Sequence, residues 1–128
     1  MARQLQFEDG QEDADVVAYV SVSKLDMQQY ASSKSKVNKS SVLCWNEHIF
    51  LQGQHASQAV LQDAMIEVHI QEKSQQERNK LVGMYEFSLE SIYQRKDHAL
   101  LHQWVALVDN SQRSKRAQDI AGYLRVSI

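Results

Sequence analysis

The chain has 128 residues, of which 43% are hydrophobic and 23% are charged, and its formal net charge is −2. These values predict one compact, soluble domain with a single core and exclude a second domain. The chain contains no stretch of about 18 apolar residues that could span a bilayer, and its first residues lack the layout of a signal peptide, so any membrane contact is expected to be peripheral.

Strands are predicted wherever apolar and polar residues alternate, because neighbouring side chains of a half-buried strand point to opposite faces of the sheet. The apolar positions of these alternating segments are, in chain order, Ala18, Val20 and Val22; Ile66, Val68 and Ile70; Tyr85, Phe87 and Leu89; and Leu124, Val126 and Ile128. Each set predicts one apolar face of a strand that packs on a core.

Three further segments are less regular. A fifth strand is expected to begin at Trp45, with Ile49 and Leu51 on its apolar side, although Phe50 interrupts the alternation. Residues 57–63 are expected to form a short helix and residues 89–94 a helical turn. Because no helical periodicity dominates, the chain is predicted to be an antiparallel β-sandwich.

Five short motifs then occur in a fixed order along the chain. They are Asp15 to Val22, Lys34-Ser-Lys36, Trp45-Asn46-Glu47, Leu81-Val82-Gly83 and Gly122-Tyr123-Leu124-Arg125-Val126. This order resembles the C2 domain family over essentially the whole of residues 1–128. The resemblance implies an all-β, antiparallel, eight-stranded C2-type Greek-key sandwich of type II topology, forming a single domain and cut from a larger multi-C2 protein.

A narrower likeness lies in the second half of the chain. The stretches from Ser91 to Ala99, from Trp104 to Asp109 and at Gly122-Tyr123 are similar to the second C2 domain of the ferlin family, which includes dysferlin, myoferlin and otoferlin. One departure concerns the start, because the family's first strand is expected to be missing or truncated before Ala2. A missing strand would leave a neighbouring edge with open backbone donors and acceptors.

Calcium-binding C2 domains carry five aspartates in two loops, because calcium needs six to eight oxygen ligands and several carboxylates. By resemblance, Asp9 and Asp15 match the two aspartates of the first loop, whereas Glu72, Ser74 and Lys80 stand in the places of the other three. A lysine about 4 Å from a divalent ion would repel it by roughly 8 kcal/mol at an effective dielectric constant of ~20. Asp9, Asp15 and Glu72 are therefore interpreted as vestigial calcium positions, and no cofactor is expected. For the acidic run of the first loop, a solvated acidic loop, weak residual calcium binding and partner docking remain open; its members are Glu8, Asp9, Glu12, Asp13 and Asp15.

A lysine-bearing strand face is the second feature that the resemblance implies, since it meets anionic lipid headgroups in the family. Lys34 and Lys36 share a face by the period of two, and Lys39 joins them only if the strand ends or bulges first. Three lysines supply roughly 3 kcal/mol near an anionic leaflet, so durable attachment would need linked domains. The alternative is an ordinary solvated strand face whose lysines protect against edge pairing.

Catalytic chemistry finds no support in the sequence. No serine, and not the single Cys44, is combined with a histidine and a carboxylate in a recognisable signature, and His98 and His102 lack further metal ligands nearby. Cys44 cannot form an internal disulfide, which favours an intracellular, reducing compartment. The later basic residues, such as Arg95 and Lys96, are read as surface loops rather than as a nucleic-acid site, and Trp45 and Trp104 are expected to fill the core.

The predicted function is therefore a non-enzymatic module that binds an anionic phospholipid membrane surface, a protein, or both, with little or no dependence on calcium. The resemblance implies a role in vesicle trafficking, membrane fusion or repair at the cytosolic face of a vesicle or of the plasma membrane. Two alternatives remain: a protein-interaction or intramolecular scaffold module without lipid binding, whose partner would dock on the open edge or around Tyr19 and Tyr123, and a calcium-dependent phospholipid sensor.

Overall fold

The computed structural model describes residues 1–3, 5, 13–23, 30–31, 35–38, 45, 47–50, 57–73, 78–109 and 119–128. Its strands are β1 (Ala2–Arg3), β2 (Asp13–Val22), β3 (Tyr30–Ala31), β4 (Ser35–Asn38), β5 (Met65–Glu72), β6 (Lys80–Ser88), β7 (Gln103–Asp109) and β8 (Asp119–Val126). Two short helices, α1 (Gln58–Asp63) and α2 (Leu89–Tyr93), and a 3-10 turn, η1 (Lys96–His98), complete the described elements. The prediction of an all-β fold is confirmed.

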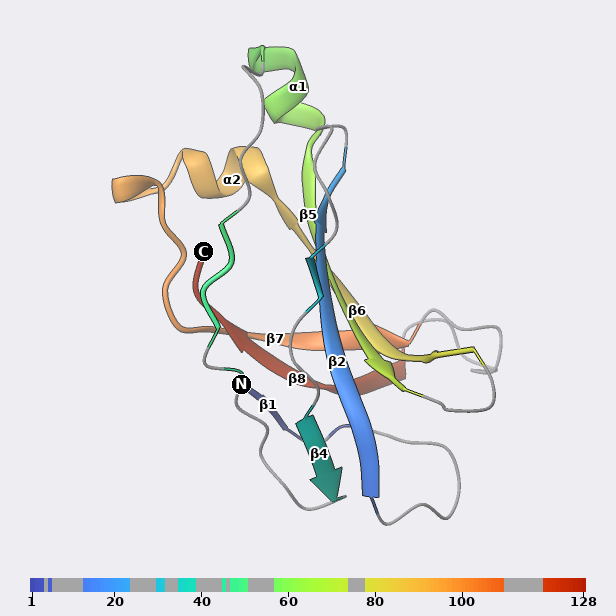
Figure 1. The fold of residues 1–128 in the computed structure, drawn as a ribbon. Helices are drawn as coiled ribbons and strands as arrows, with labels where there is room; N and C mark the ends of the chain where they lie inside the picture. The colour runs from blue at the N-terminus through green and yellow to red at the C-terminus, as the bar shows by residue number, and fades with distance from the viewer. Residues whose placement is uncertain are drawn as a thin grey trace.

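One curled sheet contains the described strands, in the order β1-β8-β7-β6-β5-β2-β3, with β4 also paired to β2. Each strand pair in this order is antiparallel. Figure 1 shows that β7 and β8 run across the direction of β2 and β5, so the sheet folds over on itself. The result is the predicted antiparallel sandwich, in which the two halves of one sheet enclose the core.

The core lies between these halves and follows the predicted alternation closely. Ile70 of β5 and Leu107 of β7 are completely buried, although they come from different halves of the sandwich. The predicted positions Ala18, Val22, Ile66, Val68, Phe87 and Leu124 are buried in the same cluster. Val20, Tyr85, Leu89 and Val126 pack against it while remaining partly exposed. Ile128 was predicted to belong to this face but is 38% exposed, because β8 ends at Val126.

The first strand is short, as expected, and it covers part of the neighbouring edge. Ala2 pairs with Leu124 and Arg3 pairs with Tyr123 of β8. Gly122 makes this approach possible, since it has a φ of 151° and a Cβ built on it would lie 2.8 Å from a Leu5 methyl carbon and 3.1 Å from the Arg3 carbonyl oxygen. Only glycine adopts such a backbone conformation readily, so Gly122 lets the N-terminal segment lie directly over β8.

Both predicted helical segments are present, and each begins with a serine cap. The Val60 backbone N–H donates to Ser57 Oγ at 3.3 Å, and the Ser91 backbone N–H donates to Ser88 Oγ at 3.2 Å. A serine oxygen at this position satisfies a backbone donor that has no partner within the helix. In the described part of the chain, no helix is long and apolar enough to cross a bilayer.

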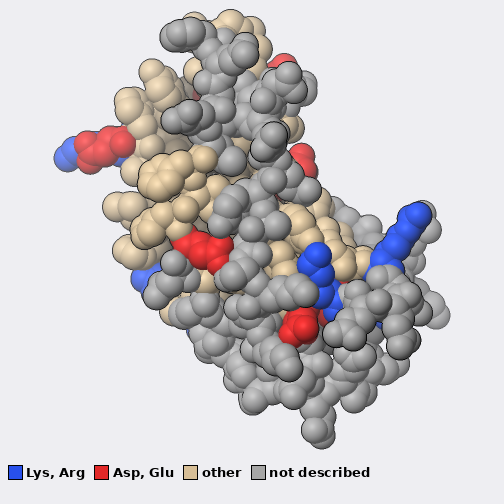
Figure 2. Space-filling model, viewed as in Figure 1, with Lys and Arg blue, Asp and Glu red and all other residues tan. Residues whose placement is uncertain are grey.

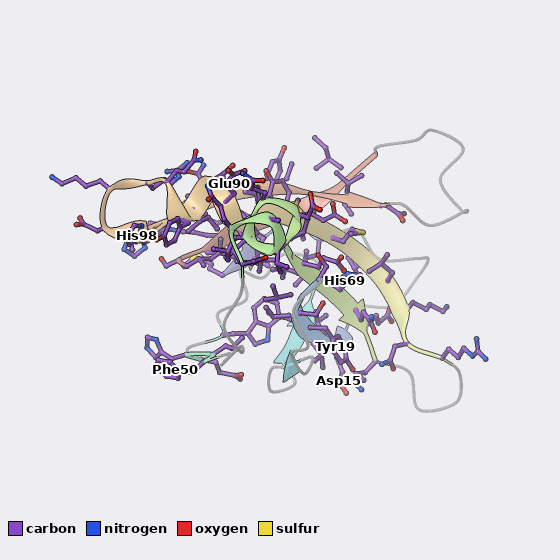
Figure 3. All side chains as sticks on the ribbon, turned by 90° about the horizontal axis from the view of Figure 1, so that it is seen from above. Asp15, Tyr19, Phe50, His69, Glu90 and His98 are labelled. Carbon is purple, nitrogen blue, oxygen red and sulfur yellow. The ribbon has the colours of Figure 1, made fainter. Side chains whose placement is uncertain are left out.

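The prediction of a strand that begins at Trp45 is wrong. Trp45 and residues 47–50 are described, and none of them is in a strand. Phe50 is 88% exposed, and Figure 3 shows it away from the curled sheet. The described strands pair among themselves in the order β1-β8-β7-β6-β5-β2-β3, with β4 on β2, and none of them includes residues 45 or 47–50. Trp45 itself does pack against the core, as predicted.

Candidate functional site

Two of the vestigial calcium positions lie side by side at one end of the sheet. Val16, the residue after Asp15 in β2, is the cross-strand partner of Glu72 in β5. The Lys73 backbone N–H donates to the Asp15 carbonyl oxygen at 2.7 Å, which fixes the start of the following loop against β2. The structure therefore places Asp15 and Glu72 on neighbouring strands at the same end of the sheet, one residue out of register, so that their side chains start from opposite faces. Asp9 and Ser74 lie outside the described residues.

Lysines lie beside these carboxylates. Lys80 of β6 is the cross-strand partner of Glu72, and Lys73 follows Glu72 directly along the chain. The Lys73 Nζ is 5.6 Å from the centroid of the Tyr19 ring, and the Asn79 side-chain amide donates to the Tyr19 hydroxyl at 3.3 Å. Figure 3 shows Tyr19 and Asp15 on the same part of β2. Two residues near the acidic positions are thus lysines, which offer no oxygen ligand to a divalent ion.

No group of three His, Cys, Asp or Glu side chains gathers in a metal-binding arrangement among the described residues. His98 stacks on Tyr93 with ring centroids 4.4 Å apart, and its Nδ1 is hydrogen-bonded to the Tyr93 carbonyl oxygen. The His102 backbone N–H donates to Ser127 Oγ at 3.0 Å. These contacts give both histidine residues structural partners at the end of the sheet that carries α2.

The predicted lysine strand lies next to the same end of β2. Lys36 is in β4 and is the cross-strand partner of Asp15, while Lys34 and Lys39 lie outside the described residues. Sequence reasoning treated the lysine face and the acidic positions as two separate surfaces. The pairing of β2 with both β4 and β5 makes them one region, which we call the β2 end and define as Asp15, Lys36, Glu72, Lys73 and Lys80.

Charges of both signs are interspersed elsewhere on the surface as well. Figure 2 shows, on the face that it presents, Lys or Arg atoms beside Asp or Glu atoms at several places rather than one continuous basic field. On β5, the His69 Nε2 lies 3.3 Å from the Glu67 carboxylate. Exposed pairs of this kind contribute little to stability because solvent screens them.

The sequence did not predict a cluster of arginine and aromatic side chains on the outer face of the sheet. One of its members, Trp104, was assigned to the core. Trp104 was predicted to fill the core, but it is only half-buried and lies outside the core cluster. Its neighbour Val105 is buried there instead, so Trp104 is on the opposite face of β7. There the Arg3 guanidinium carbon lies 4.3 Å from the centroid of a Trp104 ring. The signal available in the sequence was the alternation of Trp104 with Val105 and Leu107.

Comparison with known proteins identifies a family and a similar solved structure. The model of the C2 domain family matches residues 1–107 of this chain. Among solved structures, the C2A domain of plant extended synaptotagmin 1 is similar, with a TM-score of 0.69 and 18% sequence identity. That similarity covers 98% of this chain and 84% of the other, and at this identity it concerns the fold. No curated protein matches the chain.

Proposed function

The chain belongs to the C2 domain family, and from that premise we propose that it attaches peripherally to anionic phospholipid membranes without requiring calcium. C2 domains are typically non-enzymatic modules that bind membranes or proteins. The observation that carries the calcium-independent form of the proposal is the placement of lysines at the β2 end. Lys80 lies across from Glu72, and Lys36 lies across from Asp15, so each of the two described acidic positions has a lysine on the next strand.

This arrangement favours a lipid over an ion on electrostatic grounds. Lysines beside Asp15 and Glu72 offset the negative charge that would attract Ca²⁺, and they add positive charge that an anionic headgroup can approach directly. Each basic residue near an anionic leaflet contributes about 1 kcal/mol, so one module would attach reversibly and gain from linked domains. The cytosolic face of a vesicle or of the plasma membrane is the location that suits such attachment.

The experiment is cosedimentation with vesicles of phosphatidylserine and phosphatidylcholine, in buffer with calcium and in buffer with a chelator. We expect equal binding in both buffers and weaker binding as salt is added, because salt screens the attraction. Vesicles of phosphatidylcholine alone are the control. Binding that needs calcium would contradict the calcium-independent form, and binding that ignores salt would contradict the electrostatic one.

A role in vesicle trafficking, fusion or repair is the finer part of the proposal. It rests on the resemblance of residues 91–99 and 104–109 to the second C2 domain of the ferlins, whereas the comparisons with known proteins identify the C2 family alone. Localisation of the tagged chain in cells, with a variant in which Lys34, Lys36 and Lys39 are replaced by Ala, tests it. A wild-type chain that stays away from membranes while it still binds vesicles in vitro would separate lipid binding from a trafficking role.

Binding to a protein partner is the second candidate, and one observation favours it. Ile120 of β8 is 52% exposed although it lies within a strand. The short strand β1 pairs with β8 at Leu124 and Tyr123, further along the strand than Ile120. An exposed apolar residue beside a sheet edge is suited to a partner that adds a strand. The Ile120→Ser variant is expected to lose such a partner while it keeps vesicle binding. Loss of vesicle binding instead would assign Ile120 to the lipid surface.

A further inference from the structure

The cluster around Trp104 combines two arginines and two aromatic residues on the outer face of β1, β8 and β7. Arg3 of β1 is the cross-strand partner of Tyr123 in β8, and Arg125 of β8 is the cross-strand partner of Trp104 in β7. Tyr123 and Arg125 are two residues apart, so their side chains project from the same face of β8. The four residues therefore form one continuous surface across three strands, which we call the arginine face.

Within the arginine face, the Arg3 guanidinium packs on both aromatic residues. The Arg3 guanidinium carbon is 5.8 Å from the centroid of the Tyr123 ring and 4.3 Å from that of a Trp104 ring. Because β8 lies between β1 and β7, the Arg3 side chain must cross β8 to reach Trp104. It then lies beside Arg125, which is paired with Trp104. A guanidinium packed on an aromatic ring keeps its N–H donors free at its edge.

Among the described residues, no carboxylate offsets the positive charge of this face. Across the residues that the structure describes, neither Arg3 nor Arg125 has a carboxylate within ion-pair distance. The Arg125 Nε is buried and has no hydrogen-bond partner. Buried donors in folded proteins nearly always have a partner. The unpaired Nε therefore leaves the Arg125 guanidinium incompletely hydrogen-bonded, and an anion held by its remaining donors and by Arg3 would suit this face.

We propose that Arg3 and Arg125, supported by Trp104 and Tyr123, form a binding site for a phosphate monoester. Two guanidiniums match the charge of nearly −2 on such a phosphate and its three terminal oxygens, whereas a single carboxylate needs only one bidentate arginine. The site is separate from the β2 end, since β1, β8 and β7 stand at the opposite end of the strand order from β4. It holds independently of the calcium-independent attachment proposed above.

The direct test uses inositol 1,4,5-trisphosphate as a soluble phosphate monoester and calorimetry as the readout, with unphosphorylated inositol as the blank. We expect measurable binding that falls at least tenfold in the Arg3→Gln, Arg125→Gln double variant. The matched control is Arg78→Gln with Arg95→Gln, which removes two exposed arginines away from the arginine face and is expected to leave binding unchanged. Replacing Lys34, Lys36 and Lys39 by Ala is also expected to leave it unchanged. Equal loss in the control variant, or undiminished binding in the double variant, overturns the proposal.

A second variant guards against misfolding. Arg3→Lys with Arg125→Lys keeps both charges but removes the bidentate donors, and it is expected to retain the wild-type thermal midpoint while it weakens the trisphosphate several-fold. Vesicles of phosphatidylcholine with and without phosphatidylinositol 4,5-bisphosphate identify the source of the phosphate. Arginine-dependent binding of both soluble and vesicle phosphate assigns a lipid headgroup, and binding of the soluble form alone assigns a soluble phosphorylated ligand. No binding of either form by the wild-type chain refutes the site.

Discussion

Basic residues stand at two edges of the curled sheet, but their surroundings differ. At the β2 end, Lys36 and Lys80 are the cross-strand partners of Asp15 and Glu72. On the arginine face, Arg3 and Arg125 adjoin aromatic rings instead of carboxylates. Lysine is a compact, strongly hydrated charge that suits a membrane surface by charge alone, whereas a guanidinium packed on a ring keeps directed hydrogen-bond donors. The comparison teaches that placement among neighbours, more than the number of basic residues, decides where an anion can bind.

The largest effect is expected from a variant that detaches β1, because β1 carries Arg3 of the arginine face. The Gly122→Ala variant places a Cβ within 3.1 Å of the Arg3 carbonyl oxygen at a φ of 151°. We expect it to lower the free energy of unfolding by about 2–4 kcal/mol, and so the thermal midpoint by roughly 3–6 °C for each kcal/mol. Thermal unfolding followed by circular dichroism measures the effect.

Gly83→Ala is the matched control for the detached strand. A Cβ there would lie 2.9 Å from Leu107 Cβ and 3.0 Å from Ala121 Cβ, so this variant also strains the sandwich, but away from Arg3. Both variants should be less stable than the wild type, and only Gly122→Ala should weaken trisphosphate binding in the folded protein. A Gly122→Ala variant with the stability of the wild type would show that β1 is not held as described.

The predicted lysine strand gives the next largest effect. Replacing Lys34, Lys36 and Lys39 by Ala should weaken vesicle binding by roughly 3 kcal/mol, about a hundredfold, because each lysine contributes about 1 kcal/mol near an anionic leaflet. Cosedimentation with phosphatidylserine vesicles measures the change. Lys96→Ala is the control, since Lys96 is exposed on η1. If the triple variant binds vesicles as tightly as the wild type, these lysines do not belong to the membrane-binding site.

Replacing a lysine of the β2 end by a carboxylate tests whether lysine is what prevents calcium binding there. Lys80→Asp puts a second carboxylate directly across from Glu72, so calcium should now bind to the folded state. In calcium at about ten times its dissociation constant, the variant should gain about 1 kcal/mol of stability that the wild type does not gain. Thermal melts with and without calcium measure it, and adding Asp15→Asn should abolish the gain. A similar gain in the wild type would revive the calcium sensor.

The smallest effect concerns Tyr19, where the two kinds of contact can be separated. Tyr19→Phe removes the hydroxyl that accepts from Asn79 but keeps the ring beside Lys73. The free energy of unfolding should fall by less than about 1 kcal/mol, because the hydrogen bond is exposed to water. Tyr19→Ala removes both contacts and should cost more. Chemical unfolding with urea resolves the two variants, and identical losses would mean that the ring contributes nothing.

Several features of the fold were predictable because they depend on neighbours in sequence. The alternation at Ile66, Val68 and Ile70 predicted a buried strand face, and Ser57 and Ser88 cap the two short helices where helical turns were expected. The segment at Trp45 failed for the opposite reason. Its apolar residues suit a strand, but a strand also needs a free hydrogen-bonding edge, and that edge depends on which other strands lie nearby.

The candidate sites also combine features that depend on neighbours in sequence with features that depend on the arrangement of the strands. By itself, the sequence determined the strand faces, the helix caps and the residue types at the calcium positions, because these follow from periodicity, local hydrogen bonding and charge. Only the tertiary structure decided that Lys36, Asp15 and Glu72 share one end of β2, and that Arg3 reaches Trp104 from the far end of the chain. Cross-strand register brings such residues together, and register is set by the packing of the whole sheet rather than by any single segment.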